Sequence, residues 1–395
     1  MPNSRTRFLM AVALLLISAV CAAAERKATP KRAPAPAAPL ERERKKLLAT
    51  HPLVLGYYIE DARALSSVKE NAAQITVLAP QSYVLEADGV VRGAVPSQLA
   101  ALAERHRLPV MPLIVNSDFD RKAVSTILRS PKLQERTASY MAYLARRGNF
   151  VGWQLDFEHI DPADKAHYSA FVRRVAAKLH RDGRLLSVAV TPRFSDAFPD
   201  DREVPYRTGE WGAGFDYRSL GAYADFVVLM AYDQHTSATP PGPVAGYDWV
   251  RAALEYATSR IPPGKLVLGV PLYGREWVVT PSGQISRSLN YDSLSSLLGR
   301  PEIEVRWHDS WRTPWVQYRE EPDTHTVWFE NHRSFEEKLG LVKTLGLRGV
   351  AAWRVGFESP EFWSVAAAWA AELGRDTAID HDKGRKTTRD SSGSQ

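Results

Sequence analysis

Apolar runs of β type alternate with amphipathic helical stretches from Leu53 onward, and this alternation restricts the possible folds most. Most runs are continuously apolar, which is typical of parallel strands buried on both faces. Eight strands alternating with helices over roughly 300 residues predict a (β/α)8 barrel, an α/β fold also called a TIM barrel. A doubly wound open sheet is the alternative, but no Gly-rich phosphate loop follows the first strand. The predicted strands are 53–58, 75–79, 109–115, 151–158, 185–191, 226–232, 266–272 and 349–353.

The alternation breaks once, between the seventh and the eighth predicted strands. This interval contains a turn signal at 280–283, the residues Trp307, Trp311 and Trp315, and a strand-like run at 326–329. A single crossover helix does not need so many residues. We therefore expect a small α+β insertion at about 277–329, carried on a βα loop, which in a barrel lies on the active-site face.

Both ends of the chain differ in composition from the predicted barrel domain at 51–372. Arg5 and Arg7 precede a short apolar run and the small residues 22–24, which is the pattern of a cleaved secretory signal peptide at 1–24. Residues 25–50, rich in Ala, Pro, Lys and Arg, predict a basic linker, and residues 373–395 predict a disordered tail. We expect a secreted, periplasmic or envelope protein. An uncleaved anchor and a lipoprotein at Cys21 are the alternatives.

The net charge of +6 comes from the N-terminal segments rather than from the predicted barrel. Arg5 and Arg7 contribute +2 and residues 25–46 contribute +5, which leaves residues 47–395 near −1. A nucleic-acid-binding domain needs a basic excess, so we expect no nucleic-acid partner. The basic linker suggests contact with anionic envelope polymers. Cleavage after Ala24 removes Cys21, the only cysteine, so the domain must hold together by packing without disulfides. We expect a monomer.

The fourth predicted strand carries three polar side chains on one face. Gln154, Asp156 and Glu158 are spaced two residues apart, and apolar residues occupy the other face. Burying such polar groups is costly unless they bind a ligand or take part in catalysis. Because the active site of a (β/α)8 barrel lies at the C-terminal ends of its strands, we interpret the pair Asp156 and Glu158 as catalytic candidates.

Aromatic and acidic residues also end other predicted strands, and we expect them to converge in one bowl with the two carboxylates. An aromatic floor with acidic walls suits a sugar ring, whose faces are apolar and whose rim carries hydroxyl groups. The sequence contains neither a His-Glu-x-x-His motif nor clustered histidines, so we predict no metal and no cofactor. The strand-end residues are Tyr57 and Tyr58 on the first strand, Tyr232 and Asp233 on the sixth, Tyr273 after the seventh and Trp353 on the eighth.

In these motifs the sequence resembles glycoside hydrolase family 18, the chitinase-like barrels. The family pattern Asp-Gly-x-Asp-x-Asp-x-Glu corresponds here to Val-Gly-Trp-Gln-Leu-Asp-Phe-Glu at 151–158, so the glycine, the last Asp and the Glu match. The pattern Met-x-Tyr-Asp is matched in full at 230–233, and further matches lie at 269–274, 328–331 and 349–353. The resemblance covers residues 51–370 and is closest to the spore-germination branch, which cleaves peptidoglycan at N-acetylglucosamine.

The resemblance implies a role for each residue of the predicted site. Glu158 would be the general acid, and Asp156 beside it should raise the pKa of Glu158. Asp156 would also orient the substrate's acetamido group and stabilise an oxazolinium-like intermediate, because this family uses the substrate's own N-acetyl oxygen as the nucleophile. Tyr232 would donate a hydrogen bond to that acetamido group, and Trp353 would be the floor under the sugar. The remaining substrate-binding candidates are Asp233, Gln154, Tyr57 and Tyr273.

Gln154 is the main departure from the family pattern, which has Asp at this position. An amide donates a hydrogen bond but cannot take a charge, so Asp156 would stay ionised more simply. These observations predict a secreted glycosidase that acts on N-acetylglucosamine polymers such as peptidoglycan or chitin. The alternative is a non-catalytic sugar-binding barrel, but such relatives usually lose the Glu that is present here as Glu158.

Overall fold

The computed structural model describes residues 46–49, 52–196 and 212–374. The predicted signal peptide, nearly all of the predicted linker and nearly all of the predicted tail lie outside this part of the chain. Within it, no helix is long and apolar enough to span a membrane.

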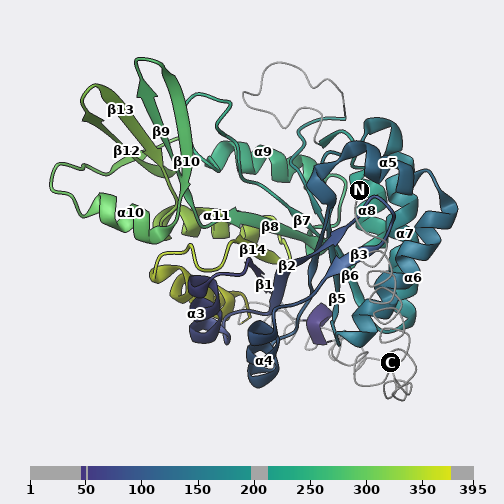
Figure 1. The fold of residues 1–395 in the computed structure, drawn as a ribbon. Helices are drawn as coiled ribbons and strands as arrows, with labels where there is room; N and C mark the ends of the chain where they lie inside the picture. Colours follow the sequence, from purple (N-terminus) through teal and green to yellow (C-terminus); the bar gives the residue numbers. More distant parts are fainter. Residues whose placement is uncertain (1–45, 50–51, 197–211, 375–395) are drawn as a thin grey trace, which may run out of the picture. The chain divides into compact units, whose positions relative to one another are not determined.

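Eight parallel strands close into a barrel, which confirms the predicted fold class (Figure 1). The first strand pairs with both the second and the last, so the sheet has no open end among these strands. A short additional strand, β3 (Val91–Gly93), pairs antiparallel with β2. In the order of the barrel the strands are β1 (Leu53–Tyr58), β2 (Val77–Leu85), β4 (Leu113–Asn116), β5 (Gly152–Asp156), β6 (Leu185–Val190), β7 (Phe226–Leu229), β8 (Leu266–Pro271) and β14 (Gly349–Trp353).

Helices connect the strands of the barrel. Several begin at a side chain that accepts a hydrogen bond from the first turn, as Asp61, Ser130 and Asn331 do, so the caps satisfy backbone N–H groups that have no partner within the helix. The helices are α3 (Ala62–Asn71), α4 (Ser97–His106), α5 (Arg121–Leu128), α6 (Pro131–Arg147), α7 (Lys165–Arg181), α8 (Tyr217–Tyr223), α9 (Tyr247–Thr258) and α11 (His332–Thr344).

Some predicted strand bounds were wrong. β2 runs from Val77 to Leu85 rather than over 75–79, and β4 begins at Leu113, with Val110 forming only an isolated bridge to Leu78. β7 ends at Leu229 instead of at Tyr232. The N–H of Met230 still bonds to Val190 of β6, but the N–H of Tyr232 bonds back to the carbonyl of Met230, which turns the chain out of the sheet.

Side chains of the strands alternate between the barrel interior and the layer between sheet and helices. On β1, Leu53, Leu55 and Tyr57 belong to the interior cluster, whereas Val54 and Tyr58 pack in the outer cluster. The expectation that Tyr58 joins the bowl was therefore wrong, because adjacent residues of a strand point to opposite faces.

The N-terminal end of the barrel is closed by residues that precede β1. Leu47 is buried in the interior cluster. The guanidinium of Arg348, which immediately precedes β14, donates to the carbonyl of Leu47 at 2.8 Å and to that of Leu48 at 3.2 Å. Arg348 is itself buried, so these carbonyls replace part of the hydration that its charge loses.

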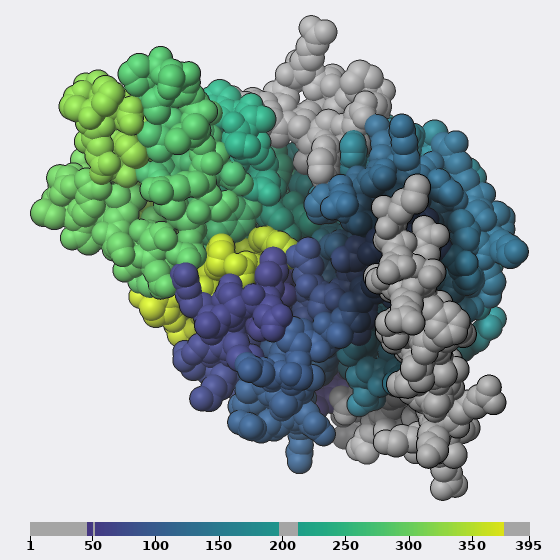
Figure 2. Space-filling view, in the orientation of Figure 1, coloured from purple at the N-terminus to yellow at the C-terminus, as the bar shows by residue number. Residues whose placement is uncertain are grey.

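A second sheet lies between β8 and β14. It has five antiparallel strands, and α10 (Tyr291–Leu298) contributes Leu294 to a small core with Val316 and Val327. Figure 2 shows this insertion in green beside the purple segment that contains α3, and Arg63 of α3 forms an ion pair with Asp292 of α10 at 2.8 Å. The strands are β9 (Gly274–Thr280), β10 (Gly283–Leu289), β11 (Arg306–His308), β12 (Thr313–Glu320) and β13 (Asp323–Trp328).

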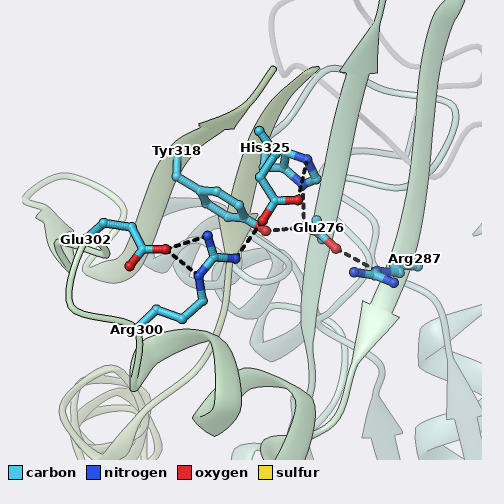
Figure 3. A network of polar contacts seen from close by, with 7 residues as sticks. Glu276, Arg287, Arg300, Glu302, Tyr318 and His325 are labelled. Carbon is cyan, nitrogen blue, oxygen red and sulfur yellow. Dashed lines mark hydrogen bonds and ion pairs between the residues drawn. The ribbon is translucent and has the colours of Figure 1, made fainter. Parts of the chain in front are cut away.

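A buried carboxylate, Glu276 on β9, sits at the centre of a polar network in the insertion (Figure 3). The hydroxyl of Tyr318 donates to Glu276 Oε1 at 2.8 Å, and Nδ1 of His325 lies 2.8 Å from the same oxygen. The Nε of Arg287 donates to Glu276 Oε2 at 2.6 Å. Burial alone would raise the pKa of Glu276, but these three hydrogen bonds outweigh burial and lower it.

Candidate active site

Glu158 lies just beyond the end of β5 and is held there by the neighbouring strand. β5 ends at Asp156, so the predicted strand over 151–158 was too long. Beyond it, the side chain of Asn116, the last residue of β4, accepts from the N–H of Glu158 at 3.0 Å and donates to its carbonyl at 3.2 Å. The side chain of Asn116 therefore replaces the backbone of a neighbouring strand, and its two hydrogen bonds hold the backbone of Glu158 in place.

Gln154 and Asp156 point into the barrel and are both buried. The amide nitrogen of Gln154 donates to Ser187 Oγ on β6 at 2.9 Å. Among the described residues, no hydrogen-bond donor reaches Oδ1 of Asp156. A buried carboxylate oxygen without a donor is unfavourable, so this position is suited to a ligand that brings its own N–H or positive charge.

The electrostatics of the carboxylates follow from burial and crowding. Burial raises the pKa of Asp156. Burial, the charge of Asp156 and the charge of Asp233 together raise the pKa of Glu158. Both carboxyls therefore hold a proton more readily than exposed ones do, which runs against the expectation that Asp156 stays ionised beside Gln154. For Glu158 this is the property that a general acid needs near neutral pH.

Three aromatic rings meet beside the carboxylates. The ring of Trp353 lies 5.2 Å from that of Tyr57, edge to face, and 6.5 Å from that of Tyr232, nearly parallel. Burial, and then the neighbouring phenol of Tyr57 and the charge of Asp156, raise the pKa of Tyr232, so its hydroxyl stays a hydrogen-bond donor. Gly269 makes room for this ring, because a Cβ there would lie 3.0 Å from Tyr232 Cε1 and 2.6 Å from the carbonyl of Leu229.

Asp233 follows Tyr232 and connects the barrel to the insertion. Its backbone adopts a left-handed conformation, with φ of 56°. The hydroxyl of Tyr273 donates to Asp233 Oδ1 at 2.6 Å, and the guanidinium of Arg275 on β9 donates to the same oxygen at 3.1 Å. The side chain of Asp233 remains about half exposed, at 47%. This carboxylate is therefore anchored by two donors and still open on its other side.

The structure brings all eight predicted site residues into one neighbourhood: Glu158, Asp156, Tyr232, Trp353, Asp233, Gln154, Tyr57 and Tyr273. Sequence reasoning missed Asn116, Ser187 and Arg275. Asn116 ends β4, so its position was itself a signal. Arg275 follows Tyr273 by two residues, but its partner Asp233 is 42 positions away. Within the described ranges no cluster of three or more metal-ligating residues occurs.

Paired carboxylates beside aromatic rings at the strand ends of a (β/α)8 barrel are suited to a sugar substrate, whose ring faces are apolar and whose glycosidic bond is cleaved with the help of a carboxylic acid. The chain matches the family model described as glycosyl hydrolases family 18 over residues 55–358. The chain belongs to this family, which confirms the resemblance seen in the sequence, and it is a glycosidase.

Individual relatives agree with the family assignment. The chain is 27% identical over 317 residues to the uncharacterized glycosylase YvbX of Bacillus subtilis (strain 168), covering 79% of this chain and 89% of that protein. Among solved structures, it resembles the spore cortex-lytic enzyme SleL of Bacillus megaterium QM B1551 (TM-score 0.72, 28% identity, 80% of this chain and 74% of that one). It also resembles a chitinase of Chromobacterium violaceum ATCC 12472 (TM-score 0.74, 27% identity, 81% and 99%).

Proposed function

We propose that this protein is an exported hydrolase of N-acetylglucosamine polymers, with peptidoglycan as its substrate, and that it works by substrate-assisted catalysis with retention of configuration. The observation that carries the proposal is the position of Glu158: half-buried, next to Asp156 and Asp233, with a pKa raised by burial and by both charges. The similarity to a spore cortex-lytic enzyme supports an envelope polymer as the substrate. Export by a signal peptide at 1–24 belongs to the same proposal.

In the proposed mechanism, Glu158 protonates the glycosidic oxygen while the carbonyl oxygen of the acetamido group attacks the anomeric carbon. The bond to the leaving sugar breaks, and a cyclic oxazolinium ion forms on the substrate. Water then attacks the anomeric carbon from the face that the leaving sugar vacated. The bond between this carbon and the oxazolinium oxygen breaks, which regenerates the acetamido group, and the water gives a proton to the Glu158 carboxylate, which restores the acid. The open Oδ1 of Asp156 is suited to accept the acetamido N–H and to stabilise the positive charge of the intermediate.

Aromatic side chains contribute to the proposed mechanism by holding the reacting sugar and its acetamido group in place. Trp353, which neighbours Tyr57 and Tyr232, offers its ring to the apolar face of the reacting sugar. The neutral hydroxyl of Tyr232 donates to the acetamido oxygen and directs it toward the anomeric carbon, which fixes the nucleophile in a reactive geometry. Asp233 is open on one side and is available to a sugar hydroxyl.

The test compares matched polymers. The mature protein is incubated with purified peptidoglycan, chitin oligomers and deacetylated glucosamine polymer, and the products are identified by mass spectrometry. We expect cleavage at N-acetylglucosamine in peptidoglycan and no cleavage of the deacetylated polymer, which lacks the nucleophile. Equal rates with and without the acetamido group, or a trapped ester on the enzyme, would refute substrate assistance. Cleavage of chitin alone would refute the assignment to peptidoglycan, and no cleavage at all would favour the sugar-binding alternative.

A further inference from the structure

Charge is strongly segregated on the barrel, although residues 47–395 are nearly neutral in sum. Helix α6 contains four Lys or Arg residues and one Glu, a net charge of +3, and α7 contains five Lys or Arg residues and no acid, a net charge of +5. These two helices together carry +8, so the remainder of residues 47–395 carries about −9. The sequence-based argument from net charge missed this basic region, because the sum hides its location.

The two helices pack side by side on the outside of the barrel (Figure 1). Side chains of both helices line a groove. It consists of two adjoining cavities of about 390 and 210 Å³, which share Lys178 and Arg181. Ala170 and Ala177 line the larger cavity, and Ser139 and Ala142 line the smaller one, so the uncharged part of the lining consists of small side chains. The cations along the groove are Arg146, Arg173, Arg174, Lys178 and Arg181.

The cations of the groove exceed the acids that could neutralise them. Glu135 forms ion pairs with both Arg174 and Lys178, at 2.7 and 2.5 Å, and Asp182 pairs with Arg146. No described carboxylate forms an ion pair with Arg173 or Arg181, and both of these residues are exposed. Two guanidinium groups are therefore available to an anion from solution.

We propose that the groove between α6 and α7 binds a linear polyanion with phosphodiester groups, of the polyol-phosphate type. A guanidinium group binds phosphate oxygens through two parallel hydrogen bonds, so each exposed arginine can hold one phosphodiester group in a fixed orientation. The 17-residue α7 is about 25 Å long, so its cations form a line rather than a point. A line of cations with small uncharged side chains beside it fits a thin chain with regularly repeated charges.

Two other polyanions fit the groove less well. Single-stranded nucleic acids bind through aromatic platforms for their bases, and no aromatic residue lines either cavity. An interfacial helix enters a lipid surface with large apolar side chains, whereas the lining here is concave and its apolar residues are alanines. The observations therefore favour a phosphodiester chain without bases or acyl groups. The inference does not depend on which sugar the active site hydrolyses.

The experiment measures binding of the full mature chain to purified poly(glycerol phosphate). The test variant, Arg173→Gln/Arg181→Gln, removes the two guanidinium groups that have no ion-pair partner among the described carboxylates. The matched control, Lys69→Gln/Arg105→Gln, removes the same charge from exposed positions on α3 and α4. We expect at least a tenfold loss of affinity in the test variant and less than a twofold loss in the control. By analogy with flexible single strands, the slope of log affinity against log salt should become shallower by about 0.7 for each phosphate group that is no longer bound.

A second variant, Ala177→Glu, places a carboxylate at an exposed position in the lining of the groove and should also lower the affinity at least tenfold, so the test does not rest on one substitution. Thermal unfolding confirms that each variant is folded. Hydrolysis of short N-acetylglucosamine oligomers by wild type is measured separately. It shows whether the proposed hydrolase activity holds even if the groove does not bind the polyanion. Equal losses in test and control variants would overturn the proposal. So would tighter binding to single-stranded DNA or to anionic lipid vesicles than to poly(glycerol phosphate).

Discussion

Asp156 in the barrel and Glu276 in the insertion are both buried carboxyls, and their environments act on the proton in opposite directions. Glu276 is 1% exposed, and its pKa is lowered because Tyr318, His325 and Arg287 all direct hydrogen bonds at it. Asp156 is 6% exposed, and its pKa is raised because burial is not offset by any donor. Burial alone therefore does not predict the charge of a carboxyl. The donors around it do.

The difference separates a structural carboxylate from a reactive one. The charge of Glu276 is compensated within the fold by three partners on strands of one sheet. The carboxyls at the end of β5 lack such compensation, and a buried group kept without it is a candidate for catalysis. The following predictions test this contrast, from the largest expected effect to the smallest.

Replacing Glu158 by Gln should have the largest effect on turnover. The amide keeps the size of the side chain but cannot deliver a proton, so kcat should fall by about 10²–10⁴-fold, the usual contribution of general acid catalysis. Binding of the oligosaccharide should survive. The matched control is Glu276→Gln, the same chemical change at the buried carboxyl of the insertion, which should leave kcat close to that of wild type at a temperature where the variant is folded. Near-normal turnover by Glu158→Gln would show that another group is the acid.

Asp156→Asn should lower kcat by about 10²-fold, because the positive charge of the intermediate loses its partner. The substitution should also lower the pKa of Glu158, since a like charge beside an acid raises its pKa. The alkaline limb of the pH–rate profile should therefore move to lower pH. An unchanged limb would mean that Asp156 does not influence the protonation of Glu158. The contrast with Glu276 would then not explain which carboxyls take part in catalysis.

The same contrast predicts opposite effects on stability. The raised pKa of Asp156 means that its contribution to stability is present at low pH and is lost as the pH rises above about 4, the ordinary carboxyl value. Asp156→Asn should thus be more stable than wild type at pH 8, with a smaller difference at pH 4. The lowered pKa of Glu276 has the opposite sign, so its contribution is present above about pH 4 and is lost in acid.

Glu276→Gln should accordingly destabilise the fold by about 1–3 kcal/mol at pH 8, because the amide NH2 would face hydrogen-bond donors in place of an acceptor. Denaturant unfolding at both pH values measures all of these differences. If both variants shift stability in the same direction at pH 8, the contrast between the two buried sites is wrong.

Gln154→Asp should have the smallest effect. It restores the residue of the family pattern and adds a titratable group beside Asp156, which should move the alkaline limb slightly to higher pH while the enzyme stays active. The loss of the hydrogen bond that Gln154 donates to Ser187 is the main structural change. A comparison of pH–rate profiles with wild type and with Ser187→Ala separates the effect of the added charge from that of the missing hydrogen bond.

Much of the fold could be predicted from the sequence, because continuous apolar runs separated by amphipathic helices leave few arrangements other than a barrel. The ends of strands were less predictable. Phe157 and Glu158 continue the pattern of β5 in the sequence, but the strand ends where pairing with its neighbours ends. Tyr232 leaves the sheet for the same reason. Tyr58 could have been placed correctly, since it alternates with Tyr57 on β1.

Residues that act across long separations account for what sequence reasoning missed at the candidate site. Asn116 holds the backbone of Glu158 from 42 positions away, and Arg275 meets Asp233 across the same separation. The place of Asn116 at the end of β4 signals that it belongs to the site, but no local pattern identifies its partner, and the same holds for the partner of Arg275 in the insertion. Only the closure of the barrel and the placement of β9 against it bring them together.

The contact of Arg348 with Leu47 and Leu48 has a practical meaning for anyone who wants to trim the chain for expression or crystallisation. The stretch that matches the family begins at residue 55, inside β1, and ends at residue 358, before the buried residues Phe362 and Trp363. A fragment cut at those limits would lack the two carbonyls that receive the Arg348 guanidinium and would uncover apolar surface at its C-terminal end. A usable fragment therefore has to retain Leu47 and Leu48 at its N-terminal end and the buried residues through Leu373 at its C-terminal end.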